Sequence, residues 1–182
     1  MRDTLLAVSG KLRTHAGGKP LWPPLPDEIL RAQPGVLEGL EGKDGGRRQG
    51  WYADKEADCD VRSLYLIQKR CLPLPFLQAF DLPDTSLSCA RRDVTTVAPQ
   101  ALNLLNSDFS QRAAKAFAER VAREAGDDAA KQLERAVWLA LGRAPSVAER
   151  GQASVFLAKH GKAALPEFCR ALLNVNEFVY VD

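Results

Sequence analysis

Four amphipathic segments in the C-terminal half constrain the fold more than any other feature of the sequence. The first three end at Gly126, Gly142 and Gly161, and the third starts with a capping box from Ser146 to Glu149. The expected helices span about 107–125, 128–141, 146–160 and 162–174. Because connections this short place consecutive helices antiparallel, the sequence predicts a mainly α fold with a C-terminal antiparallel helical bundle.

The N-terminal half is irregular and rich in proline and glycine. Residues 3–12 are expected to be the end of a helix, and residues 34–60 a long loop anchored at Trp51 and Tyr52. Residues 62–70 show in part the two-residue alternation of side chains that is typical of β-strands, which predicts a short strand or an extended segment. We expect at most one or two short strands in the whole chain. Short helices are expected at about 28–33, from Pro73 or Pro75, and from Pro99 to about Asn106.

These patterns suggest a division of the chain near residue 60. Residues 1–60 are expected to be a helix remnant and a long loop that pack on the body. Residues 61–182 are expected to form the helical C-terminal body. The length suits one structural domain overall. A chain that opens within a helix also suggests a partner segment upstream.

The charge composition argues against two classes of partner. The chain has 25 cationic and 23 anionic residues and a formal net charge of +2. Proteins dedicated to nucleic acids or membrane surfaces usually carry a strong basic excess. No apolar run is long enough for a membrane span, and the first residues lack the long apolar core of a signal peptide. We therefore expect neither nucleic-acid binding nor membrane insertion.

The sequence shows no motif for a cofactor, a metal or catalysis. The four cysteines match no C-x-x-C pair and no covalent haem motif; they are Cys59, Cys71, Cys89 and Cys169. A Cys59–Cys71 or a Cys71–Cys89 disulfide stays open, and Cys169 is expected to be buried on the apolar face of a helix. His15 and His160 have no suitably spaced third ligand for zinc. We expect no cofactor, no metal and no identifiable catalytic residue.

A group of cationic residues in the middle of the sequence is the candidate site. The possible anion-binding residues of this cationic set are Arg62, Lys69, Arg70, Arg91 and Arg92. They are interleaved with Asp81, Asp84 and Asp93, and the polar residues that lie next to the arginines are Thr95, Thr96, Gln100, Asn103 and Asn106. Guanidinium groups pair with carboxylates, sulfates and phosphates. Two interpretations stay open: an internal ion-pair network that pins irregular segments, or a surface site for a sulfated or carboxylated glycan.

Several motifs, in one order along nearly the whole chain, resemble a known domain. They are LLAVSG at 5–10, WPPLP at 22–26, RSLYLIQKR at 62–70, FDLPD at 80–84, SCARR at 88–92, TTVAPQAL at 95–102, LLN at 104–106, LGRAPS at 141–146 and LLNVNEFVYVD at 172–182. Together they resemble the planctomycete-specific C-terminal domain of unknown function, which ends large exported proteins that often begin with cytochrome-c-like modules. The chain resembles the C-terminal part of that domain.

The resemblance implies a setting and partners but no activity. It implies an extracytoplasmic location, periplasmic or secreted, and upstream modules of the same or a partner polypeptide as partners. It offers no catalytic residue to assign. We expect a non-enzymatic C-terminal structural or interaction module of a larger exported protein. The alternative is part of an enzyme or binding module that acts on anionic polysaccharides, with sulfate or carboxylate groups held by the cationic set.

Overall fold

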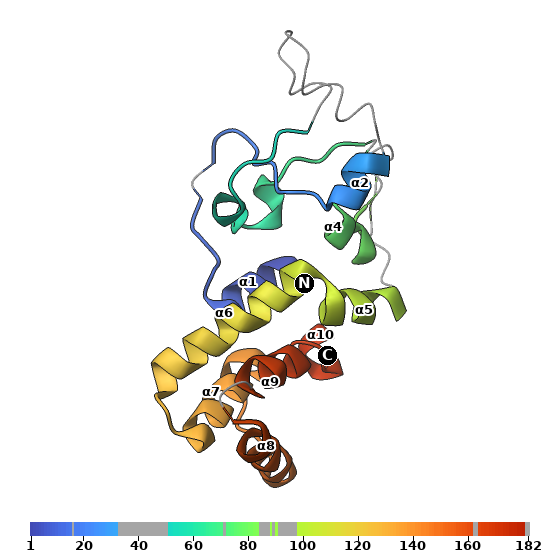
Figure 1. The fold of residues 1–182 in the computed structure, drawn as a ribbon. Helices are drawn as coiled ribbons and strands as arrows, with labels where there is room; N and C mark the ends of the chain where they lie inside the picture. Colours follow the sequence, from blue (N-terminus) through green and yellow to red (C-terminus); the bar gives the residue numbers. More distant parts are fainter. Residues whose placement is uncertain are drawn as a thin grey trace.

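The computed structural model describes residues 1–15, 17–32, 51–70, 72–83, 88, 90, 98–161 and 164–180. Within these residues the chain is mainly helical and has no named strand, which confirms the predicted fold class. Figure 1 shows a helical part that includes both ends of the described chain, and a second part with short helices above it.

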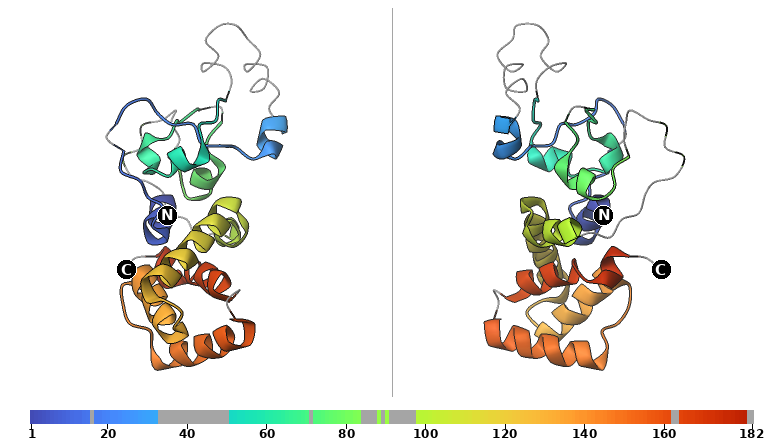
Figure 2. Two further views of the ribbon diagram at one scale, coloured as in Figure 1. Left: turned by 60° about the vertical axis from the view of Figure 1, so that its left-hand side comes forward. Right: turned by 90° about the vertical axis from the view of Figure 1, so that its right-hand side faces the viewer.

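The helical part is built around α6 (Asp108–Ala125). The other helices of this part are α1 (Arg2–Ser9), α5 (Ala98–Asn106), α7 (Ala129–Leu141), α8 (Val147–His160), α9 (Ala164–Leu172) and α10 (Asn176–Val179). α6 contacts α1, α5, α7 and α9, and its Phe117 and Val121 are completely buried. α8 packs against α7 and α9, at the end of the molecule farthest from the short helices (Figure 2).

The helices begin and end where the sequence signals predict. The Ser107 hydroxyl caps α6 by accepting a hydrogen bond from the Ser110 N–H at 3.3 Å. The Asp128 carboxylate caps α7, and Ser146 forms the expected capping box at the start of α8. Gly142 ends α7 in the left-handed conformation, with a φ of 69° that a residue with a side chain rarely adopts. These local signals explain why the helix boundaries could be predicted from neighbouring residues alone.

The second part, which we call the N-terminal layer, consists of residues 17–32, 51–70 and 72–83. Its short elements are α2 (Asp27–Ala32), the 3₁₀ turns η2 (Glu56–Cys59) and η3 (Ser63–Tyr65), and α4 (Pro75–Ala79). The rings of Trp22 and Trp51 meet edge to face with centroids 5.1 Å apart, and the Trp51 indole N–H donates to the Pro23 carbonyl at 2.8 Å. Trp51 therefore anchors its segment, as the sequence predicts.

Of the two forms expected for residues 62–70, a short strand or an extended segment, the strand is not formed. η3 occupies Ser63–Tyr65, and the pairing nearby is limited to isolated bridges, Leu21 with Leu66 and Lys69 with Leu72. The Ser63 N–H and hydroxyl both donate to the Asp3 carboxylate, at 2.8 and 2.6 Å. The Asp3 carboxylate therefore satisfies the Ser63 N–H, which in a sheet would donate to a neighbouring strand.

Two apolar clusters correspond to the two parts. The larger one combines Leu5 of α1 with side chains of the helical part, and the smaller one runs from Trp22 to Leu74. The smaller cluster draws residues from both sides of residue 60, and the domain limit expected there stays a prediction. Cys169 lies in the larger cluster and is completely buried, as predicted. Among the described helices, none has both the length and the apolar composition that crossing a membrane requires.

Candidate functional site

A cavity lies between the N-terminal layer and the α5–α6 corner, and we call it the seam pocket. Its volume is about 430 Å³. Its lining combines apolar residues, among them Pro23, Pro24, Pro26, Leu74, Phe76 and Phe109, with the polar residues Asn103, Asn106, Ser107 and Asp108. Small-molecule and peptide sites usually combine an apolar cavity with a few polar groups. The seam pocket has this composition.

Arg2 brings a buried charge to the seam pocket. Its guanidinium donates hydrogen bonds to the carbonyl oxygens of Val61 at 2.7 Å and Cys59 at 2.6 Å, and lies 5.3 Å from the centroid of the Phe109 ring. Burial lowers the pKa of Arg2, and the neighbouring carboxylates Asp3 and Asp60 oppose that effect. The side chain is only 8% exposed. Arg2 thus joins α1 to the N-terminal layer while it lines the cavity.

Three further ionisable groups line the seam pocket near Arg2. Burial raises the pKa of the Asp60 carboxyl, with Arg2 acting in the opposite direction. Arg112 forms an ion pair with Glu56, which ties α6 to the turn η2, and burial lowers the Arg112 pKa. The cations of the pocket are therefore already neutralised or hydrogen-bonded by groups of this chain.

The cationic set expected from the sequence is only partly within the described residues. Arg62 is 64% exposed, and its Nε lies 4.0 Å from an Asp3 carboxylate oxygen. The Lys69 ammonium lies 5.5 Å from the centroid of the Trp22 ring, and Arg70 is exposed. Arg62 and Lys69 therefore contact different parts of the chain. The set's remaining members, Arg91 and Arg92, and its neighbours Asp84, Asp93, Thr95 and Thr96, lie outside the described residues, so both interpretations of the set stay predictions.

The structure assigns several residues to the seam pocket that the sequence reasoning did not select. Asn103 and Asn106 were expected beside the arginines and line the seam pocket, but Arg2, Asp60 and Arg112 were not expected there. One signal for Arg2 was present: it shares a helical face with Leu5, Leu6 and Ser9, and all four are buried. The other two meet Arg2 only through packing of distant segments.

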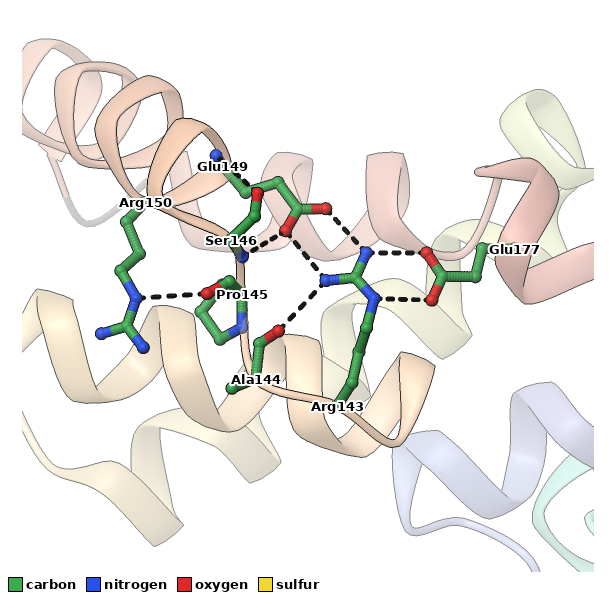
Figure 3. Close-up of polar contacts among 7 residues, drawn as sticks. All are labelled: Arg143, Ala144, Pro145, Ser146, Glu149, Arg150 and Glu177. Atoms are coloured by element: carbon green, nitrogen blue, oxygen red, sulfur yellow. Dashed lines mark hydrogen bonds and ion pairs between the residues drawn. The ribbon is translucent and has the colours of Figure 1, made fainter.

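A second ion-pair cluster, centred on Arg143, fastens the end of the helical part (Figure 3). Arg143 donates to both oxygens of Glu149 at 2.8 and 2.9 Å and to both oxygens of Glu177 at 2.6 and 2.7 Å. Its fifth bond goes to the Ala144 carbonyl at 3.1 Å, so all of its N–H groups are used. Hydrogen bonds from Arg143, followed by those from Ser146, lower the Glu149 pKa to about 2. This cluster joins α8 to α10 and has a structural role.

The two described thiols are protonated and buried, and they are not arranged with other ligands around a metal position. Cys59 is a free thiol, so the Cys59–Cys71 bridge left open by the sequence is not formed; Cys71 and Cys89 lie outside the described residues. Burial raises the pKa to about 11 for Cys59 and about 12 for Cys169, which keeps both thiols protonated at neutral pH. Among the side chains that the structure describes, no three histidine, cysteine, aspartate or glutamate residues converge on a metal position.

Comparison with known proteins gives a family but no activity. No curated protein matches the chain, and no solved structure matches it. The family model for PSD1, described as a protein of unknown function (DUF1553), matches residues 1–157. This match supports the expected resemblance to a domain of unknown function. It extends over α1, the N-terminal layer, α5, α6 and α7 and into α8, and so includes every residue of the seam pocket. Because the match covers most of the sequence, the chain belongs to the PSD1 family of unknown function (DUF1553).

Proposed function

We propose that this chain is a non-enzymatic structural or interaction module of a larger exported protein, and that the seam pocket receives a segment of an upstream module or of a partner. The observation that carries this proposal is that the pocket's cations pair with groups of this chain, while many of the other lining residues are apolar. An apolar lining beside cations that are already paired favours non-covalent docking.

The position of the seam pocket also supports a docking role. It lies where the N-terminal layer meets α5 and α6, so an occupant would contact both parts of the molecule at once. Binding across such a junction stabilises the arrangement of the two parts, because the occupant contacts only the folded form. The extracytoplasmic setting and the larger protein rest on the family resemblance of the motifs.

Titration with the upstream part of the natural gene product tests the docking proposal. We expect the two separately produced polypeptides to bind in isothermal titration calorimetry. Asn106→Trp should weaken that binding at least about tenfold, because Asn106 is exposed at the pocket and an indole there obstructs it. Ser154→Trp, at an exposed position of α8 outside the pocket, is the control and should bind as the wild type does.

Two outcomes would overturn the docking proposal. One is no detectable association of the wild-type polypeptides; the other is unchanged binding by Asn106→Trp. The setting is tested separately by fractionating the source cells with an antibody raised against this chain. The antibody should detect a gene product longer than 182 residues outside the cytoplasm, and a product of this length confined to the cytoplasm contradicts the proposed setting.

A further inference from the structure

A second groove lies between the C-terminal end of α6, α7 and the segment that leads into α8, and we call it the Trp138 groove. Its volume is about 590 Å³. None of its lining residues lines the seam pocket. A variant of one site therefore leaves the lining of the other site intact. The two sites can be tested independently.

Trp138 gives the groove an apolar platform. Its side chain is 54% exposed, whereas Trp22 and Trp51 are 4% and 3% exposed. Pro145 and Ala144 line the groove beside it. An indole this exposed loses the stabilisation that burial of its large apolar surface provides. An apolar group that covers the indole would recover that stabilisation.

Cations outnumber carboxylates around the platform. Lys131, Arg135 and Arg150 line the groove together with Glu124 and Glu134. The Arg135 Nε donates to Glu124 at 2.7 Å, and Arg150 pairs with Glu134 and donates from Nε to the Pro145 carbonyl at 3.3 Å. In the part of the chain that the structure describes, these bonds leave both Nη groups of Arg135 and the Nη2 group of Arg150 without an acceptor.

The remaining donors can therefore accept an anionic partner. Figure 3 shows Arg150 on the opposite side of the Ala144–Ser146 segment from Arg143, so Arg150 is separate from the saturated cluster around Glu149 and Glu177. A carboxylate brought to Arg135 or Arg150 would gain charge-assisted hydrogen bonds. The excess of cations in the groove favours an acidic partner over a basic one.

We propose that the Trp138 groove binds an acidic peptide segment of a partner protein. An apolar side chain of the segment would cover the Trp138 indole, and neighbouring carboxylates would pair with Arg135 and Arg150. Tryptophan and arginine are the side chains that most often dominate the energy of protein–protein interfaces. The proposal goes beyond docking at the seam pocket, because it concerns another surface and defines the chemistry of the partner.

The exposure of the three tryptophans gives a direct assay. Acrylamide quenching of the intrinsic fluorescence should report mainly on Trp138, because Trp22 and Trp51 are buried. The probe is a capped peptide of sequence EEPLEE, and QQPLQQ is its neutral counterpart. The acidic peptide should protect Trp138 from quenching, and the protection should weaken as ionic strength rises. The neutral peptide should bind at least about tenfold more weakly.

Two variants test whether the acidic peptide binds in the Trp138 groove. Trp138→Ala and Arg135→Gln should each weaken binding of EEPLEE, measured by calorimetry, at least about tenfold. Arg170→Gln is the matched control: Arg170 and Arg135 are 36% and 39% exposed, and each pairs with one glutamate, but Arg170 lies outside the groove. Thermal melts confirm that each variant is folded. If Trp138→Ala does not fold, binding of the peptide by Arg135→Gln still tests the proposal.

Three outcomes would overturn the proposal. The first is equal binding of the acidic and neutral peptides, and the second is wild-type binding by folded Arg135→Gln. The third is protection of Trp138 by an anionic oligosaccharide, hexagalacturonate, without protection by the peptide; it would reassign the groove to sugars. Asn106→Trp should leave peptide binding unchanged, so a failure here is distinguishable from a failure of docking at the seam pocket.

Discussion

Arg2 joins two parts of the chain that are far apart in sequence. The Arg2 guanidinium donates a hydrogen bond to the carbonyl of Val61, which is 59 residues away in the sequence, and it is buried beside Asp60. A buried charge is stable only when hydrogen bonds and nearby charges replace the water that it loses. The two carbonyl bonds and the Asp3 and Asp60 carboxylates provide that replacement. Arg2 is therefore a structural residue that also shapes the seam pocket.

Removing the Arg2 guanidinium should be costly. Arg2→Met keeps much of the side-chain volume but leaves the buried carbonyls of Cys59 and Val61 without donors, so we expect a loss of about 2–4 kcal/mol in the free energy of unfolding. Urea titration followed by circular dichroism measures it. Arg13→Met is the control: Arg13 binds Ala57 and Asp58 nearby but is 56% exposed, and its loss should stay below about 1 kcal/mol. Equal losses for the two variants would contradict the structural role of Arg2.

At the scale of elements, two interactions that share Glu149 stabilise the start of α8: the capping box and the ion pair with Arg143. The capping box satisfies the first N–H groups of α8, and the same Glu149 carboxylate accepts two bonds from Arg143. Arg143 in turn binds Glu177 of α10. Three elements, the α7–α8 connection, α8 and α10, are thus fastened by one guanidinium.

This arrangement predicts how stability depends on pH. Glu149 has a pKa of about 2 in the folded protein against an ordinary 4.5. A lowered folded pKa stabilises the protein above the unfolded pKa, and that stability is lost as pH falls from about 4.5 to about 2. Glu177 shifts in the same direction, through its bonds to Arg143. We expect the unfolding midpoint in urea to fall across this window.

Glu149→Gln isolates the contribution of the Arg143 cluster to this pH dependence. The variant should be less stable than the wild type at pH 7, and the difference should shrink as pH falls through the window, because protonation removes the same charge from the wild type. Glu134→Gln is the control, since Glu134 also pairs with one arginine but lies outside the cluster. A difference between wild type and Glu149→Gln that stays constant from pH 7 to pH 2 would show that the cluster does not stabilise the fold.

The sequence predicted the elements better than it predicted their contacts. Helices α6 to α9 follow from capping residues and apolar spacing, and α5 follows from Pro99 in its first turn; these signals involve residues a few positions apart. Of the two forms predicted for residues 62–70, a short strand or an extended segment, the strand did not form, because a strand needs a neighbouring strand and this segment pairs only at isolated bridges. The seam pocket could not be predicted in the same way, because Arg2, Asp60 and Arg112 meet only when α1, the N-terminal layer and α6 have packed together.

At the scale of the whole molecule, α1 belongs to both parts. Its Leu5 is completely buried in the larger apolar cluster, while its Arg2 and Asp3 bind residues 59–63 of the N-terminal layer. Figure 1 shows α1 alongside α6, below the short helices of the N-terminal layer. A destabilising change in α1 should therefore affect both parts, although their apolar clusters are separate.

We predict that the two parts unfold as one cooperative unit and that Leu5→Ala lowers the stability of both equally. Truncating a buried leucine should cost about 2–5 kcal/mol. In a Trp138→Phe background, fluorescence of Trp22 and Trp51 reports on the N-terminal layer, and far-ultraviolet circular dichroism reports mainly on the helical part. The two signals should change together in urea, and Leu5→Ala should shift both midpoints by the same amount. Val155→Ala, at a position 69% exposed on α8, should shift neither. If Leu5→Ala shifts only the circular dichroism transition, the two parts fold independently and α1 does not couple them.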